Sequence, residues 1–165
     1  MDQKKVLIIG IGNPGRGDDG LGPELIERLR RDPRTHAQNS QTHIELGHPN
    51  SAYVCEFEFR YQLNVEDAYT IKDYPFVIFA DAAMTGDEGA ALTEVFPSDA
   101  IAFTTHRMSP ASVLALCHEL YGLTPKAYIL SIRGYHWELG EGLSSRAEAN
   151  LNLALAIVRK FLALN

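Results

Sequence analysis

The strongest hydrophobic pattern in the sequence is a pair of unbroken apolar runs, at residues 5–10 (KVLIIG) and 76–80 (FVIFA). Unbroken runs of this length are typical of strands that are buried on both faces of a parallel sheet. Residues 91–96 (ALTEVF) and 127–133 (AYILSIR) predict two more strands, of which the first is the weaker.

Residues 53–61 (YVCEFEFRY) follow a different pattern, in which apolar and charged positions alternate. Cys55, Phe57 and Phe59 face one side of the predicted strand, and the charged residues between them face the other. This alternation predicts a half-exposed strand, so we expect it at an edge of the sheet.

Helical patterns occupy the segments between and after these strands. They predict helices from about Pro23 to Pro33, over 65–71, over 110–121, and from about Ser145 onward. Asn64 precedes the second helix and Ser109 the third, each as a capping residue. At the start of the last helix, Ser145 and Glu148 have the spacing of a capping box.

The alternation of strands and helices predicts an α/β fold. We expect a three-layer arrangement, in which a mostly parallel twisted sheet is covered by helices on both faces. The chain has 165 residues and contains neither a linker nor a repeat, so we interpret residues 1–165 as a single domain.

Composition and charge narrow the classes of function. The net charge is −6 and the sequence pI is about 5.5, which disfavours a nucleic-acid partner because such proteins need a clustered basic face. No apolar run is long enough to span a membrane, and the N-terminus lacks the features of a signal peptide. We therefore expect a cytoplasmic protein without a membrane partner, in which Cys55 and Cys117 are buried thiols rather than a disulfide.

Three polar features fall where strands of the predicted sheet end. Asp18 and Asp19 follow the first strand, Asp81 follows FVIFA, and His106 lies just before the helix at 110–121. In open α/β sheets, ligands bind beyond the carboxyl ends of the strands. Carboxylate oxygens and an imidazole nitrogen together suit a divalent transition metal. The pattern therefore indicates a metal-contacting site that includes Asp19, Asp81 and His106.

Each of these residues also has a purely structural interpretation. An Asp pair before a helix often caps it, and Asp18 can do so while Asp19 points into a cleft. A strand-end residue such as Asp81 can simply cap a turn, and a single loop histidine such as His106 is often exposed to solvent. His136, in GYHWE, is the reserve ligand.

The loop after the first strand, GIGNPGRGDDG, has two further interpretations. It follows a strand and precedes a helix, as phosphate-binding loops do, but it lacks their lysine and their glycine spacing. We instead expect Gly10 and Gly12 to allow a tight turn and Asn13 to hold it by side-chain hydrogen bonds. No GxSxG or HExxH motif is present, so neither a serine nucleophile nor a zinc-protease helix is indicated.

Four segments in order resemble the hydrogenase maturation protease family over nearly the whole chain. They are VLIIGIGNPGRGDDGLGPELIERL, VIFADAAMTGDEG, FTTHRMSPASVLAL and IRGYHWELGEGLSSRAEANLNLALAIV. The resemblance implies a phosphorylase/hydrolase-like fold and an endopeptidase that removes the C-terminal extension of a nickel-iron hydrogenase large-subunit precursor after nickel insertion. It also implies that Asp19, Asp81 and His106 contact nickel carried by that substrate, with no organic cofactor and a monomeric protein. Asp19 stands where many members have Glu.

Two other functions stay open at this point. A nickel-binding assembly chaperone would use the same three residues and dock on the precursor without cleaving it. Peptidyl-tRNA hydrolase, an esterase, also has GxGNPG near its N-terminus, as this chain does. However, the net charge of −6 of this chain disfavours a tRNA substrate.

Overall fold

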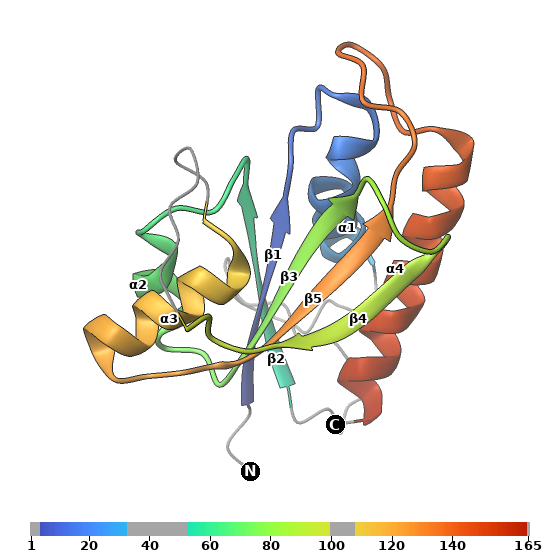
Figure 1. Cartoon of the computed structure of the whole chain (residues 1–165). Helices are drawn as coiled ribbons and strands as arrows, with labels where there is room; N and C mark the ends of the chain where they lie inside the picture. The colour runs from blue at the N-terminus through green and yellow to red at the C-terminus, as the bar shows by residue number, and fades with distance from the viewer. Residues whose placement is uncertain (1–3, 33–52, 100–107, 165) are drawn as a thin grey trace.

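The computed structural model of the chain describes residues 4–32, 53–99 and 108–164 (Figure 1). The helices and strands follow the predicted order, with one additional 3-10 turn, η1. Their bounds are β1 Lys4–Ile11, η1 Gly17–Gly20, α1 Leu21–Arg31, β2 Tyr53–Arg60, α2 Asp67–Ile71, β3 Phe76–Ala83, β4 Ala90–Val95, α3 Pro110–Tyr121, β5 Lys126–Arg133 and α4 Ser145–Leu164.

The five strands form one sheet in the order β2-β1-β3-β5-β4. All neighbours are parallel except β4, which pairs with β5 in the antiparallel direction and forms one edge. The other edge is β2, as its alternating sequence predicts, and its apolar residues face the core while its charged residues are half-exposed. The central strands β1 and β3 are the two unbroken apolar runs, because only these positions bury both strand faces.

Helices cover both faces of the sheet, so the predicted three-layer α/β architecture is confirmed (Figure 1). One core cluster joins α1 and α4 to the sheet, and a second lies between the sheet and α2 and α3. Cys55 is buried in the first cluster and Cys117 in the second, and the two are buried thiols rather than a disulfide, as expected. Among the described helices, including the 20 residues of α4, none could cross a membrane.

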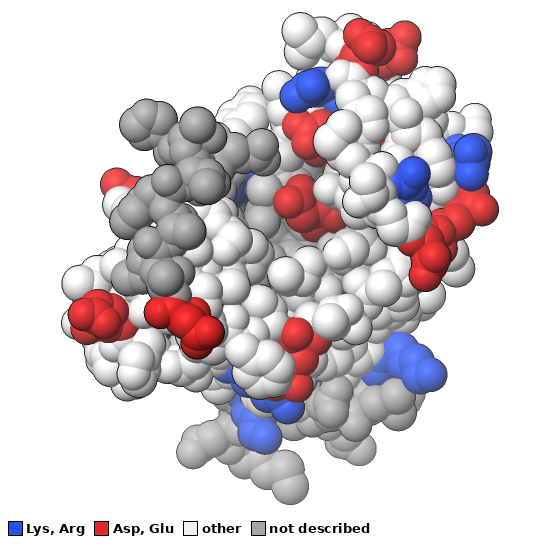
Figure 2. Space-filling model, in the orientation of Figure 1, with Lys and Arg blue, Asp and Glu red and all other residues white. Residues whose placement is uncertain are grey.

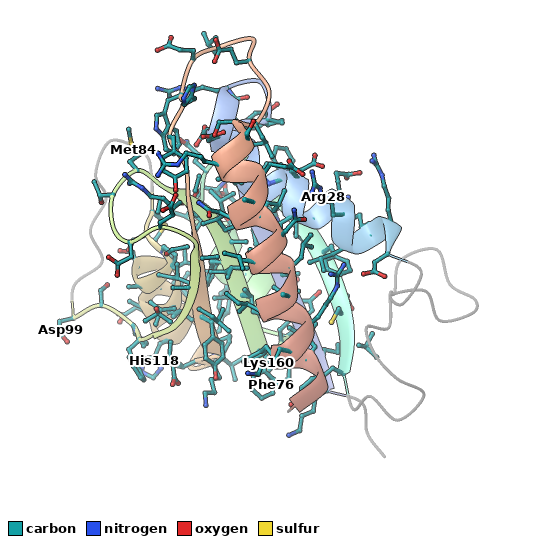
Figure 3. The ribbon with its side chains drawn as sticks, turned by 90° about the vertical axis from the view of Figure 1, so that its right-hand side faces the viewer. Arg28, Phe76, Met84, Asp99, His118 and Lys160 are labelled. Carbon is teal, nitrogen blue, oxygen red and sulfur yellow. The ribbon has the colours of Figure 1, made fainter. Side chains whose placement is uncertain are left out.

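The start of α4 differs from the prediction by one residue. Ser144, not Ser145, is the capping residue, since its hydroxyl oxygen accepts a hydrogen bond from the backbone N–H of Ala147 at 3.2 Å. Glu148 forms an ion pair with Arg28 at 2.6 Å and thereby joins α4 to α1, and Figure 3 shows Arg28 beside α4. Sequence spacing does not separate two consecutive serines, because either can precede a helix.

The beginning of the second helix also differs. Asn64 does not cap α2, which begins at Asp67, but its side-chain oxygen accepts a hydrogen bond from the Glu66 N–H and shapes the preceding turn. By contrast, α3 begins and ends as predicted. The Ser109 hydroxyl accepts a hydrogen bond from the Ser112 N–H at 3.1 Å, and Gly122 takes the left-handed conformation that ends the helix.

Candidate functional site

The strand order defines a favoured ligand position. From β1 the sheet extends to β2 on one side and to β3 on the other. The space beyond the carboxyl ends of β1 and β3 is therefore the topological switch point of the sheet, where α/β proteins bind ligands. Figure 2 shows acidic side chains in a hollow at this edge of the molecule.

Asp19 lies at this switch point, in the η1 turn that follows β1. Its side chain is half-exposed, and its Oδ2 accepts a hydrogen bond from the backbone N–H of Asn13 at 3.0 Å. The Asn13 side chain in turn accepts a hydrogen bond from the Gly15 N–H at 2.9 Å, and Asn13 thereby holds the loop. Asp19 is thus oriented by the loop while its other carboxylate oxygen, Oδ1, receives no hydrogen bond from a described residue.

Gly12 makes this loop geometry possible. Its φ of 135° is unfavourable for residues with a side chain, and a Cβ atom there would lie 1.9 Å from the Asp19 carbonyl oxygen. The tight turn at position 12 therefore requires a glycine. Its backbone N–H also donates to the Arg60 carbonyl oxygen at 2.9 Å, which attaches the loop to the end of β2.

Gly10 and Gly22 bring the first turn of α1 into contact with the sheet. A Cβ on Gly10 would lie 2.4 Å from the Gly22 carbonyl oxygen, and a Cβ on Gly22 would lie 2.6 Å from the Ala80 carbonyl oxygen. The helix start therefore rests on β1 and β3 together, which places the preceding Asp19 beside the end of β3. Sequence reasoning identified Gly10 but missed Gly22, although two glycines flanking Leu21 are an unusual way to begin a helix.

Asp81 lies near the end of β3, which extends three residues further than its apolar run predicts. It directly follows Ala80, which pairs with Gly10 of β1. The side chain is half-exposed, and its Oδ1 accepts a hydrogen bond from the Ala82 N–H at 2.8 Å. Its partner across the β3–β5 register is Ser131. The fold thus brings Asp19 and Asp81 to the same edge of the sheet.

Asp18 has a different role from the predicted helix cap. Its carboxylate is fully buried and makes no capping hydrogen bond to α1. It accepts hydrogen bonds from the backbone N–H groups of Tyr135, His136 and Ser144 at 2.7–2.9 Å, and from the Ser144 hydroxyl at 2.8 Å. Burial acts to raise the pKa of Asp18, but these four donors outweigh it and lower the pKa below its ordinary value.

Backbone hydrogen bonds extend this contact between the η1 region and the connection from β5 to α4. The Asp18 N–H donates to the His136 carbonyl oxygen at 2.7 Å, and the Gly17 N–H donates to the Glu141 carbonyl oxygen at 3.1 Å. The Arg16 side chain donates to the Trp137 carbonyl oxygen at 3.0 Å. Two segments more than 100 residues apart in the sequence therefore hold each other in place at the edge of the site.

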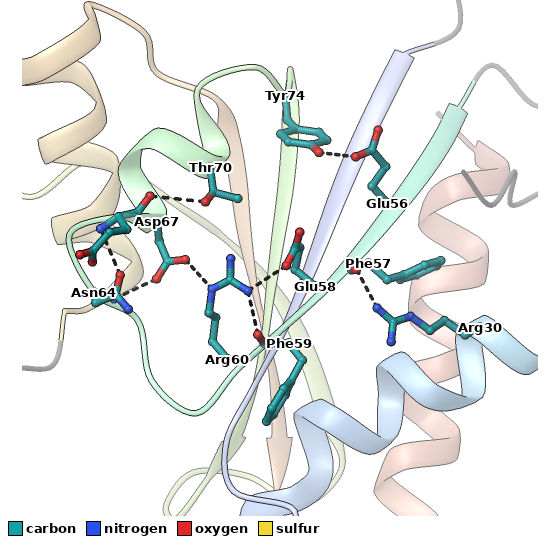
Figure 4. Close-up of polar contacts among 11 residues, drawn as sticks. Arg30, Glu56, Phe57, Glu58, Phe59, Arg60, Asn64, Asp67, Thr70 and Tyr74 are labelled. Atoms are coloured by element: carbon teal, nitrogen blue, oxygen red, sulfur yellow. Dashed lines mark hydrogen bonds and ion pairs between the residues drawn. The ribbon is translucent and has the colours of Figure 1, made fainter. Parts of the chain in front are cut away.

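A cluster of charges supports the site from the β2 side (Figure 4). The Arg60 guanidinium donates to Asp67 and to Glu58, each at 2.8 Å. Asp67 is almost fully buried, and its other oxygen accepts from the Asn64 N–H at 2.9 Å. The cluster fixes α2 against the end of β2, whose last carbonyl holds the Gly12 loop.

The third predicted residue, His106, lies outside the described residues. The described chain resumes at Met108, whose N–H donates to the Leu63 carbonyl oxygen at 3.1 Å. The reserve ligand, His136, is exposed and contributes only its backbone to the Asp18 contact. Within the described residues no group of three His, Cys, Asp or Glu side chains could hold a metal ion.

Comparison with solved structures identifies the fold. The chain is similar to the hydrogenase maturating endopeptidase HybD from E. coli, with 18% identity and a TM-score of 0.63 over 93% of this chain and 89% of that one. It is also similar to the [NiFe] hydrogenase maturation protease HycI from Thermococcus kodakarensis KOD1, with 19% identity and a TM-score of 0.63 over 97% and 93%. A third similar structure is the hydrogenase 2 maturation peptidase from Thaumarchaeota archaeon SCGC_AB-539-E09, with 18% identity and a TM-score of 0.60 over 98% and 100%.

The chain therefore has the fold of these endopeptidases over nearly its whole length. No protein-family model matches the sequence, and no curated protein matches it either.

Proposed function

We propose that the protein is a hydrogenase maturation protease, which removes the C-terminal extension of a nickel-iron hydrogenase large-subunit precursor after nickel has been inserted. One observation carries the proposal: Asp19 and Asp81 lie at the β1–β3 switch point of a fold that this chain shares with the similar hydrogenase maturation endopeptidases. The four sequence segments that resemble this family include both residues. The precursor is the partner, and the protein acts on it in the cytoplasm as a monomer.

In this proposal, the side chains of Asp19, Asp81 and His106 bind the nickel ion that the precursor already carries. Carboxylate oxygens and an imidazole nitrogen suit such an ion, and Oδ1 of Asp19 is available because Oδ2 is bound by the Asn13 N–H. The nickel then serves as a recognition signal, since only a loaded precursor presents it.

The same contacts give two routes to peptide hydrolysis. The nickel held in the substrate acts as a Lewis acid that polarises the scissile carbonyl or activates a water molecule. One of the two carboxylates acts as the general base that accepts a proton from the attacking water. The charge cluster around Arg60 and the buried Asp18 contribute by holding the loops that carry Asp19.

The decisive experiment mixes the purified protein with a nickel-loaded large-subunit precursor from the same organism, with a nickel-free precursor alongside. Intact-mass spectrometry follows both precursors over time. We expect a discrete C-terminal peptide to be lost from the loaded precursor and not from the nickel-free one. An unchanged mass together with a stable complex on a sizing column would instead identify an assembly chaperone. If neither cleavage nor a complex is observed, hydrolysis of peptidyl-tRNA is the next reaction to test.

A further inference from the structure

Arg133 is the last residue of β5 and lies at the same edge of the sheet as the two carboxylates. In the parallel register between β3 and β5, Asp81 pairs with Ser131 and Ala83 pairs with Arg133. Because side chains alternate along a strand, Asp81 and Arg133 belong to the same face of the sheet. Two residues along the strand and one strand across place their Cα atoms about 8 Å apart.

The Arg133 guanidinium has an unused hydrogen-bond donor. Its Nη1 is buried, and no residue in the described part of the chain accepts a hydrogen bond from it, while the residue as a whole is half-exposed and can be reached from solvent. Its Cζ lies 5.5 Å from the centre of the Tyr135 ring. The nearby carboxylate of Glu88 is engaged elsewhere, since it accepts from Arg146 at 2.7 Å and from the Tyr135 hydroxyl at 3.1 Å.

A buried, unpaired donor on Arg133 lowers the stability of the free protein. A buried donor without an acceptor loses its hydration, and the loss is larger when the group is charged. Buried polar groups in folded proteins are nearly always hydrogen-bonded, so the unpaired donor of Arg133 is a group that an acceptor from a ligand can complete. The planar guanidinium matches the geometry of a carboxylate and can bind both of its oxygens.

We propose that Arg133 binds a carboxylate of the precursor, supplied by an acidic side chain of its C-terminal extension or by the C-terminus itself. This inference rests on the proposed function, which makes a C-terminal segment the substrate. Asp19 and Asp81 make the site edge negative and would repel an acidic group on the approaching chain, whereas Arg133 supplies the opposite charge on the same face. Arg133 is therefore a specificity-determining residue for the extension.

The test compares Arg133→Met with Arg133→Lys and with the matched control Arg146→Met, whose guanidinium is paired with Glu88. On the nickel-loaded precursor we expect Arg133→Met to raise KM about 10- to 100-fold, the size of a lost hydrogen bond to a charged group, with kcat unchanged. Arg133→Lys should be intermediate, and Arg146→Met should be within about twofold of the wild type.

Stability separates this role from a structural one. Because the Arg133 donor is unsatisfied in the free protein, Arg133→Met should leave the thermal unfolding midpoint unchanged or raise it. A fall in the midpoint, together with an unchanged KM, would show that Arg133 serves the fold and would overturn the proposal.

Changes in the precursor identify the source of the carboxylate. Acidic residues of the extension are changed to their amides in the precursor, and synthetic extension peptides are made with a free or an amidated C-terminus. The change that removes the bound carboxylate should weaken binding to the wild type and should abolish the difference between the wild type and Arg133→Met. A difference that persists with every carboxylate removed would overturn the proposal.

Binding of the synthetic peptides, measured by fluorescence anisotropy, distinguishes failure of the protease proposal from failure of the Arg133 proposal. If the wild type does not cleave the loaded precursor, the proposed protease function fails, but the free-acid peptide still tests Arg133. Equal affinity of the wild type and Arg133→Met for that peptide would overturn the role of Arg133 while leaving the protease proposal untouched.

Discussion

Asp18 and Asp19 are neighbours in the sequence but belong to two different regions of the molecule. Asp18 is fully buried in the contact between η1 and the β5–α4 connection, where four donors satisfy its carboxylate. Asp19 is half-exposed at the β1–β3 switch point and is held by a single backbone N–H. A carboxylate with all its acceptor positions occupied can only stabilise the fold, whereas one with an available oxygen can bind a ligand.

The largest expected effect concerns the switch-point residues. Asp19→Ala, Asp81→Ala and His106→Ala should each reduce cleavage of the loaded precursor below detection, a loss of about 10²–10⁴-fold or more. For the Asp19 and Asp81 variants, the free energy of unfolding should change by less than about 1 kcal/mol, because both side chains are half-exposed. Intact-mass kinetics and urea unfolding provide the two measurements. Normal processing by any of the three variants would remove that residue from the site.

Asp18→Ala should produce the opposite result. It leaves three backbone N–H groups without their acceptor, and each buried donor in that state costs about 1–3 kcal/mol, so we expect a loss of about 3 kcal/mol or more. Urea unfolding of Asp18→Ala beside Asp19→Ala measures the contrast directly. Equal stabilities for the two variants would mean that the distinction between the two regions is wrong.

The pH dependence of stability provides a second test of the role of Asp18. The pKa of Asp18 is lowered from its ordinary value of 3.8 in the folded protein, so its contribution is complete above that value and is lost as the pH falls below it. The stability difference between the wild type and Asp18→Asn should therefore be constant near neutral pH and should shrink in acid below about pH 4. Unfolding measured at a series of pH values tests this, and a difference that grows in acid would contradict it.

The smallest expected change in the free energy of unfolding comes from replacing the capping residue of α4. Ser144→Ala removes the helix cap and one donor to Asp18, so it should cost about 1–2 kcal/mol. Ser145→Ala is the matched control, because Ser145 is exposed and should change stability by less than about 0.5 kcal/mol. Thermal unfolding of the two variants under one condition decides between them, and a larger loss from Ser145→Ala would restore the capping box predicted from sequence.

Much of the fold could be predicted because its signals are local. The unbroken apolar runs at β1 and β3, the alternation in β2, and the Ser109 and Gly122 boundaries of α3 each depend on a few consecutive residues. The site was predictable to the extent that it follows from strand ends, which placed Asp19 and Asp81 at one edge of the sheet. The helix starts at α2 and α4 cannot be predicted to the exact residue, since neighbouring polar residues compete for the capping position.

Periodicity and chain order encode the α/β class, the three layers, the edge position of β2 and the two carboxylates at the strand ends. Three further features emerge only in the folded molecule: Asp18 is structural, Gly22 sets the first turn of α1 against β3, and Arg133 lies on the same sheet face as Asp81. Each of these outcomes depends on residues that are distant in the chain. Their contacts arise from the register of neighbouring strands and the packing of loops, which no local pattern specifies.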